Sequence, residues 1–312
     1  MVKKSILIIG GGGFFGKSII DFFLKKKSLH NKINKIIIIT KSTKNFIHPD
    51  LKKNYKIIRI KRDISKVKRI PFANYILYCV TTKNSKEDNK GVKNYCKLAK
   101  KYHVNSSIVY TSSGAVYGKQ PKKILRIKDS FAVDLDQKLS KSKKNYALQK
   151  IKNEKIFKEL SNYGIKVSVA RCFAFVGKNL PLNKNYVIGN FIDSILNKKE
   201  IIVKSKIKVI RSYMHSDDLA DCLLKLVFRN TKNFNTYNIG AEKPIDIHKL
   251  AMFLSNRYNL KCITPYKIIN NDEDRYVPSI KKFRIKFKYK KKNDSYAAIF
   301  KTIKELDQID KY

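Results

Sequence analysis

The stretch Ile6–Gly16 reads ILIIGGGGFFG and changes character in its middle. An apolar run ends in consecutive glycines, and an apolar-periodic segment follows them. This order predicts a strand, a tight turn and a helix. Glycines let the backbone approach a phosphate group closely, and the first amides of the helix can then donate hydrogen bonds to it. Two registers fit such a nucleotide-binding turn: G-x-x-G-x-x-G through Gly10, Gly13 and Gly16, and G-x-G-x-x-G beginning at Gly11.

Strands and helices alternate along the chain after this turn. Strands are predicted at residues 5–9, 35–40, 55–60, 75–80, 107–111 and 166–171, and helices at 15–27, 89–102 and 143–161. This alternation predicts an α/β fold, a Rossmann-like doubly wound parallel sheet with helices on both faces. Ligands of such sheets lie at the carboxyl ends of the strands.

The regular alternation of predicted strands and helices ends after Gly177. Helices are predicted at 186–197, 216–228 and 246–258, and short strands at 201–203, 209–213 and 236–239. The tail from Lys281 is basic and then weakly helical. We therefore predict a Rossmann domain over residues 1–178, which also contains 214–240. The predicted substrate-binding lobe is smaller and comprises residues 179–213 and 241–312.

The composition bounds the class of protein. The chain has 312 residues, of which 43% are hydrophobic, and its formal net charge is +45. Because lysines occur in nearly every segment, we attribute the charge to composition and predict no specific nucleic-acid partner. The scattered cysteines, without a C-x-x-C pair, predict no metal site and a reducing compartment. We also find no signal-peptide pattern and no apolar run of the ~20 residues that a membrane span needs, which predicts a cytoplasmic protein.

Tyr146 and Lys150 are four residues apart in a predicted helix and therefore share a face. A free tyrosine ionises near pH ~10, and an ammonium ~4–6 Å away lowers that value by roughly 1–3 units. The phenol then becomes a usable acid–base group near neutral pH. A serine hydroxyl at the end of the preceding strand, in Thr111-Ser112-Ser113, is suited to hold the substrate oxygen.

These residues stand among motifs that resemble the extended short-chain dehydrogenase/reductase family, in its NAD(P)-dependent nucleotide-sugar epimerase/dehydratase branch. The resemblance covers almost the whole chain. It rests on the glycine turn, Asp63, Gly91 with Asn94, the segment Ser112–Gly118, Tyr146 with Lys150, and the segments 171–177, 211–218, 237–240 and 275–278.

The resemblance implies a role for each matching residue. Ser113, Tyr146 and Lys150 correspond to the catalytic triad. The implied cofactor-binding residues are Gly10, Gly13, Phe14, Phe15, Gly16, Thr40, Lys41, Ser42, Asp63, Ile64, Val80, Thr81 and Lys150. The implied substrate-binding residues are Asn179, Arg211 and Arg275. A guanidinium fork suits paired phosphate oxygens, so the arginines are expected to grip the diphosphate of a nucleotide-diphosphate sugar.

The end of the second strand bears on the cofactor. It reads Thr40-Lys41-Ser42-Thr43-Lys44, and the next acidic residue is Asp50. NAD enzymes place a carboxylate here for the ribose hydroxyls, whereas hydroxyl and lysine groups suit the charge of about −1.5 to −2 on a 2′-phosphate. We therefore favour NADP over NAD. The alternative is that these lysines reflect only the composition of the chain.

Departures from the family pattern reduce the number of reactions that we expect of this chain. Dehydratases of this branch place an Asp-Glu pair after the catalytic serine or threonine, and Gly114 and Ala115 stand there in this chain. The usual asparagine after the sixth strand is Ala174, in a segment that resembles surface-polysaccharide sugar enzymes, 4-ketosugar reductases among them. The expected activity is therefore oxidation or reduction at C4 of a nucleotide-activated sugar.

Two kinds of enzyme use this catalytic triad and dinucleotide, a 4-epimerase and a 4-ketoreductase, and we expect one of them, in surface-polysaccharide or deoxysugar biosynthesis. The alternatives are a nucleotide-sugar 4,6-dehydratase and a non-catalytic dinucleotide-binding sensor or scaffold. The family also implies a homodimer formed through the helices predicted at 89–102 and 143–161.

Overall fold

The computed structural model of the chain describes residues 4–29, 31–44, 47–82, 84–133, 139–182, 186–231, 233–266, 269–290 and 293–309. The chain divides into two compact units. Unit 1 comprises Met1–Val116, Asp134–Cys172 and Ala220–Tyr237, and unit 2 comprises Tyr117–Val133, Phe173–Leu219 and Asn238–Tyr312. The sequence-based division assigned four segments to the first domain that cluster with unit 2 instead: residues 117–133, 173–178, 214–219 and 238–240. The assignment of dinucleotide and substrate to separate lobes stays a prediction.

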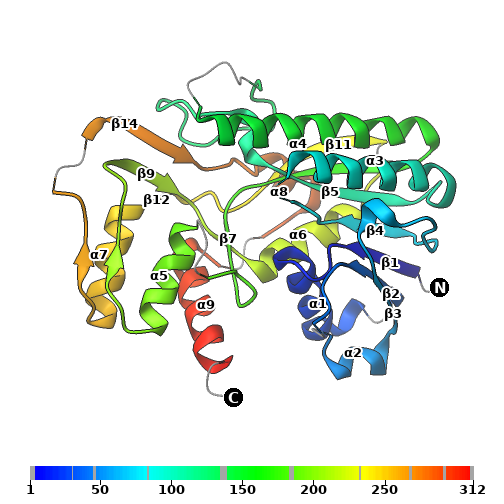
Figure 1. Cartoon of the computed structure of the whole chain (residues 1–312), viewed down its shortest axis with the longest axis horizontal. Coiled ribbons are helices and arrows are strands. Elements are labelled where there is room, and N and C mark those ends of the chain that lie inside the picture. The colour runs from blue at the N-terminus through cyan, green and yellow to red at the C-terminus, as the bar shows by residue number, and fades with distance from the viewer. Residues whose placement is uncertain are drawn as a thin grey trace. The chain divides into compact units, whose positions relative to one another are not determined.

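Unit 1 is built on a seven-stranded sheet with the order β11-β6-β5-β4-β1-β2-β3 (Figure 1). The described pairings among β1 to β6 are all parallel. The order reverses between β1 and β4, where a doubly wound sheet opens its ligand crevice. The predicted α/β fold is therefore confirmed. The strands are β1 (Lys4–Ile9), β2 (Ile33–Thr40), β3 (Lys56–Lys61), β4 (Tyr75–Tyr78), β5 (Ser107–Ser113), β6 (Lys166–Cys172) and β11 (Phe234–Ile239).

Helices cover both faces of this sheet. α3 (Ser85–Tyr102) and α4 (Lys141–Glu159) lie side by side over one face (Figure 1). α1 (Phe14–Lys25), α2 (Pro49–Asn54) and the C-terminal part of α6 (Ser216–Phe228) lie on the other side (Figure 1). Because both faces are covered, the central strands are continuous apolar runs rather than alternating ones.

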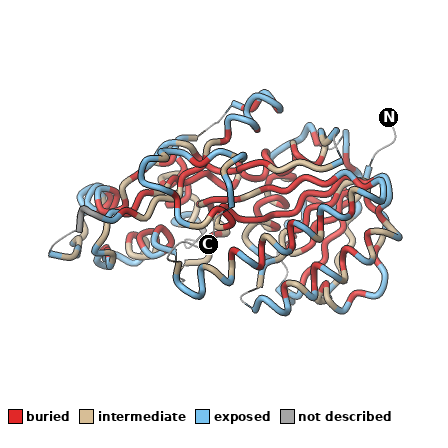
Figure 2. The backbone as a smooth tube through the Cα atoms, turned by 90° about the horizontal axis from the view of Figure 1, so that it is seen from above, coloured by how far each residue is buried: buried red, intermediate tan, exposed pale blue. Residues whose placement is uncertain are grey.

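The core of unit 1 fills the space between the sheet and the α3–α4 layer. Leu7 and Ile9 of β1 face this layer and pack in one cluster with Val92 and Tyr95 of α3 and Phe157 of α4. The buried backbone of the sheet and the exposed outer turns of the helices are distinguished in Figure 2. This packing fixes the carboxyl ends of the strands, on which a ligand site depends.

Unit 2 contains small sheets and short helices. β9 (Ile207–Arg211) is the centre of a three-stranded sheet between β12 (Ile245–Asp246) and β14 (Ile269–Tyr276). β7 (Phe175–Val176) pairs with β10 (Met214–His215), and β8 (Ile201–Ile202) pairs with β13 (Cys262–Ile263). The helices are α5 (Val187–Leu196), α7 (Ile247–Tyr258), α8 (Lys281–Phe287) and α9 (Ser295–Ile309).

Most predicted elements are present, with shifted ends where a local cap decides. α3 starts at Ser85 rather than at residue 89, because the Asn84 side chain accepts hydrogen bonds from the amides of Lys86 and Glu87. The sequence analysis missed α2, which begins with Pro49 and is capped by the His48 ring. Among the described residues, no helix combines the length and apolar character needed to cross a membrane.

Candidate active site

The glycine turn between β1 and α1 has the geometry of a phosphate-binding loop. Gly10 has a φ of +88°, a backbone conformation that favours glycine, and its carbonyl accepts a hydrogen bond from the Gly13 amide at 3.0 Å. A Cβ atom at Gly16 would lie 2.4 Å from the Gly10 carbonyl oxygen, so the turn packs against α1 only with glycine there. Gly13 precedes α1 and makes no side-chain cap, which leaves this helix N-terminus suited to an anion.

A crevice of about 280 Å³ opens in unit 1 at the carboxyl ends of β1, β2 and β4. Nine of the predicted cofactor-binding residues line it: Gly10, Gly13, Thr40, Lys41, Ser42, Asp63, Ile64, Val80 and Thr81. Phe14, Phe15 and Gly16 instead form the first turn of α1. Sequence reasoning missed further lining residues that directly follow strands or begin α3, among them Arg62, Thr82, Glu87 and Asp88. The available signal was a position after a strand for Arg62 and Thr82, and a position in the first turn of α3 for Glu87 and Asp88.

The β2 end of the crevice carries an ion pair. The Lys41 ammonium lies 2.6 Å from the Asp63 carboxylate. The hydrogen bond to Asp63 raises the pKa of Lys41. Burial alone would raise the pKa of Asp63, but hydrogen bonds from Lys41 and Ser65 outweigh it and lower that pKa. Arg59 donates to the carbonyls of Ser42 and Lys44 at 2.8 Å each, so a guanidinium braces the loop after β2.

Lys150 joins the crevice to the predicted catalytic tyrosine. It is only 1% exposed, and its ammonium donates to the Thr81 hydroxyl at 2.6 Å. The same ammonium lies 5.8 Å from the centre of the Tyr146 ring and 5.3 Å from that of Tyr110. Tyr146 is half-buried on α4, one turn before Lys150. The helix thus brings the predicted phenol and ammonium together beside the crevice.

Buried carboxylates balance the charge of Lys150. Burial lowers the pKa of Lys150, and the negative charges of Asp88 and Glu154 oppose this shift. Asp88 is held in place by the Thr82 amide at 3.0 Å and the Asn153 side-chain amide at 2.8 Å. Fixed carboxylates offset part of the cost of burying this ammonium and help to hold it in position.

The end of β5 presents two serines in different environments. The Ser112 hydroxyl donates to Glu154 at 2.5 Å, and Arg171 holds the same carboxylate with two hydrogen bonds at 3.1 and 2.7 Å. Ser113, the predicted catalytic serine, is 8% exposed, and its hydroxyl accepts from the Ala115 amide at 3.2 Å. The Ser112–Glu154–Arg171 network therefore anchors the strand end that carries Ser113.

The predicted substrate residues Asn179, Arg211 and Arg275 all belong to unit 2. Arg211 donates to the Asp274 carbonyl at 2.6 Å and to its carboxylate at 3.0 Å. Arg275 donates to the buried carboxylate of Glu273 at 2.7 Å.

The pairing of β9 with β14 sets the directions of the two guanidinium groups. It places Arg211 opposite Tyr276, and Ile210 opposite Arg275. Because side chains alternate along a strand, the two guanidinium groups leave opposite faces of the small sheet. A joint grip by both on one diphosphate stays a prediction.

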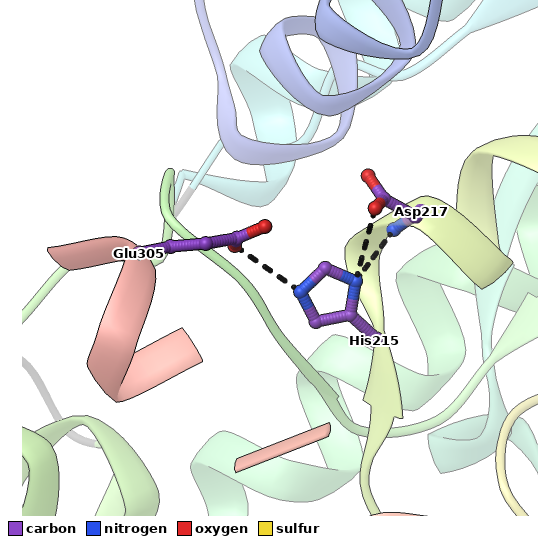
Figure 3. A group of neighbouring side chains, drawn as sticks. All are labelled: His215, Asp217 and Glu305. Carbon is purple, nitrogen blue, oxygen red and sulfur yellow. Dashed lines mark hydrogen bonds and ion pairs between the residues drawn. The ribbon is translucent and has the colours of Figure 1, made fainter. Parts of the chain in front are cut away.

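A separate cluster in unit 2 joins His215, Asp217 and Glu305 (Figure 3). His215 is fully buried; its Nδ1 accepts from the Asp217 amide at 3.1 Å, so Nε2 carries the proton and donates to Glu305 at 3.2 Å. Lys301 pairs with the Asp217 carboxylate at 2.6 Å. Both ring nitrogens are thus engaged on opposite sides of the ring, an arrangement that ties α9 to the start of α6 rather than one that points at a common cation.

Known proteins match this chain over most of its length. The family model described as NAD dependent epimerase/dehydratase family matches residues 6–240. A putative UDP-glucose 4-epimerase of Methanocaldococcus jannaschii is 26% identical over 259 residues, which cover 78% of this chain and 79% of that protein.

Solved structures share the fold. The UDP-N-acetylglucosamine 4-epimerase of Methanobrevibacter ruminantium M1, in complex with UDP-N-acetylmuramic acid, has a TM-score of 0.80 at 20% identity and covers 100% of both chains. A double mutant of the dTDP-glucose 4,6-dehydratase DesIV of Streptomyces venezuelae, solved with NAD, has a TM-score of 0.79 at 15% identity over 96% of both chains. The match to residues 6–240 decides the family: this chain belongs to the NAD dependent epimerase/dehydratase family.

Proposed function

We propose that this protein is a nucleotide-sugar oxidoreductase that acts at C4 of the sugar, as a 4-epimerase or a 4-ketoreductase. The observation that carries the proposal is the position of Lys150, whose buried ammonium lies 2.6 Å from Thr81 in the crevice and 5.8 Å from the Tyr146 ring. Both the relatives' reactions and this geometry fit proton exchange with a sugar hydroxyl beside a dinucleotide.

The residues present fit a nicotinamide dinucleotide. The glycine turn and the uncapped start of α1 suit its pyrophosphate, and Asp63 with Ile64 lines the crevice where the adenine is expected. When bound, the nicotinamide supplies hydride exchange with the sugar carbon. Tyr146 then exchanges the hydroxyl proton, Lys150 favours the phenolate form of the tyrosine by its charge, and Ser113 orients the sugar oxygen.

We further propose NADP as the preferred dinucleotide. The support is the loop after β2, where Lys41 and Arg62 line the crevice and Arg59 braces the backbone. The Lys41–Asp63 ion pair at 2.6 Å also places a carboxylate in this region. The preference for NADP therefore requires that Lys41 leave Asp63 to contact the 2′-phosphate. Equilibrium binding of NADPH and NADH to the purified protein tests it, and equal or tighter binding of NADH contradicts it.

The substrate we propose is a nucleotide-diphosphate sugar, held by Asn179, Arg211 and Arg275. Arg211 and Arg275 each form an ion pair with a β14 carboxylate, which a diphosphate of higher charge can replace. Surface-polysaccharide or deoxysugar biosynthesis in the cytoplasm is the corresponding role. A homodimer through α3 and α4 also stays a proposal, to be measured by light scattering of the purified protein.

The decisive variant is Tyr146→Phe, with Tyr163→Phe as the matched control, because Tyr163 is a half-exposed tyrosine that follows the same helix. Turnover of nucleotide sugars and their 4-keto derivatives should fall about 10²–10⁴-fold in Tyr146→Phe and stay unchanged in the control. Dinucleotide binding should survive. Full turnover by Tyr146→Phe contradicts the proposal and favours a non-catalytic sensor or scaffold.

The same assay separates the reactions. Net consumption of NADPH with a 4-keto sugar identifies a reductase, and interconversion of two sugars without net consumption identifies an epimerase. Release of a 4-keto-6-deoxy product identifies a 4,6-dehydratase, for which Gly114 and Ala115 offer no acid–base side chain.

A further inference from the structure

A second hollow, of about 420 Å³, lies in unit 1 on the outer side of α3, against the 3-10 helix Ile64–Lys66. Four lysines of α3 line it: Lys86, Lys90, Lys93 and Lys97. Their spacing of three or four residues places them on one stripe of the helix. No carboxylate lines this hollow among the residues that the structure describes.

The acidic and basic side chains of α3 line different hollows. Its only acidic residues, Glu87 and Asp88, line the dinucleotide crevice, and Asp88 is buried there. Four of its six lysines line the other hollow, and the remaining two, Lys100 and Lys101, stand in the last turn of the helix. In contrast to this stripe, some lysines elsewhere in the described part of the chain are paired with carboxylates, such as Lys53 with Asp50. The composition of the chain explains many exposed lysines, but it does not explain this separation of charge along one helix.

The four ammonium groups of the stripe repel one another, and no carboxylate in the described part of the chain is paired with them. Like charges three or four residues apart destabilise a helix, and none of the four lysines has an ion-pair partner there. The wall opposite them is fixed, because the Asn94 side chain donates to the carbonyls of Ile64 at 2.7 Å and Val67 at 2.9 Å. Bound anion charge would relieve the repulsion without reshaping the hollow.

We propose that this hollow binds an oligophosphate, a chain of two or three phosphate groups that is free or forms the tail of a nucleotide. Lysines are flexible donors with a full positive charge, which suits several phosphate oxygens at once. No aromatic side chain lines the hollow among the described residues, so nothing there stacks on a base.

The test is calorimetric titration of the full-length protein with inorganic triphosphate in about 0.15 M salt, where long-range attraction is largely screened. Saturating NADP is present, so that the glycine turn is blocked. The double variant Lys90→Ala/Lys93→Ala removes two lining charges, and Lys26→Ala/Lys27→Ala removes two exposed charges elsewhere in unit 1. Circular dichroism confirms that both variants are folded.

We expect one bound triphosphate per chain and roughly tenfold or more weaker binding in Lys90→Ala/Lys93→Ala, because two charge-assisted contacts are lost. The control should bind as the unaltered protein does. UTP should compete with triphosphate, and uridine should not. Equal weakening in both double variants, or no saturable binding at all, overturns the proposal and attributes anion attraction to the total charge.

Discussion

Replacing Glu154 with glutamine tests whether the buried network beneath the candidate site holds β5 in place. The Glu154 carboxylate accepts hydrogen bonds from Ser112 and from two nitrogens of Arg171, and all three side chains are largely buried. Glutamine has nearly the same shape but only one acceptor oxygen. It can keep part of this pattern, and it leaves the guanidinium without a compensating charge.

The expected cost follows from that loss. Breaking a buried ion pair by removal of one partner costs about 3–5 kcal/mol, and a retained neutral hydrogen bond returns about 1 kcal/mol. We therefore expect Glu154→Gln to lower the free energy of unfolding by about 2–4 kcal/mol. At about 2–4 °C per kcal/mol, the thermal midpoint should fall by roughly 5–15 °C.

Thermal unfolding followed by circular dichroism measures this shift, with Glu159→Gln as the control because Glu159 is exposed on the same helix. The control should change the midpoint by no more than about 2 °C. A matching midpoint for Glu154→Gln and the unaltered protein would refute the reasoning. Since Ser112 adjoins Ser113, turnover should also fall in Glu154→Gln at a temperature where that variant is fully folded.

Two further predictions concern buried histidines. His103 is buried and donates to the Pro71 carbonyl, and burial lowers its pKa to about 4. As the pH falls, His103 therefore takes up its proton in the unfolded chain before it does so in the folded chain. The free energy of unfolding should decrease by roughly 3 kcal/mol between about pH 6.5 and about pH 4. His103→Gln should reduce this pH dependence, which is measured as the unfolding midpoint in an acid titration. At the other histidine, Glu305→Ala removes the acceptor of the His215 Nε2 proton and should cost about 1–3 kcal/mol in denaturant unfolding, whereas Glu305→Gln keeps an acceptor and should cost less than about half of that. Equal costs for the two variants would show that the hydrogen bond to His215 does not stabilise unit 2.

The framework of unit 1 was predictable because its signals are local. The isoleucine run of β2 and the glycines after β1 specify a buried strand and a tight turn without reference to the rest of the chain. The four-residue spacing of Tyr146 and Lys150 places them on one face of any helix, and the structure brings the ring and the ammonium together.

The ionic partners of the site were not predictable in this way. Asp88 and Glu154 lie on helices whose local pattern does not show which charged residues turn inward, and both are buried near Lys150. Likewise, a resemblance to a diphosphate-binding arginine does not show that Arg275 is held by Glu273. Such pairings depend on which segments meet in space, and the sequence of a single element carries no record of that.

The charge distribution along α3 leads to one more testable difference. The net charge of +45 suggests a strongly positive surface, yet the dinucleotide crevice contains the carboxylates of Asp63, Glu87 and Asp88 beside the cations of Lys41 and Arg62. Dissolved salt weakens the attraction between an anionic ligand and exposed charged side chains. Hydrogen bonds from backbone amides at a helix N-terminus depend less on the salt concentration than contacts to exposed ammonium groups do. The affinity for NADH, which lacks the 2′-phosphate, should therefore change little, by less than about threefold, between about 0.05 M and 0.3 M salt, and triphosphate affinity should fall by about tenfold or more over the same range. An equally steep salt dependence for both ligands would mean that the overall charge of the chain, rather than the sorting of charges on α3, governs how anions bind.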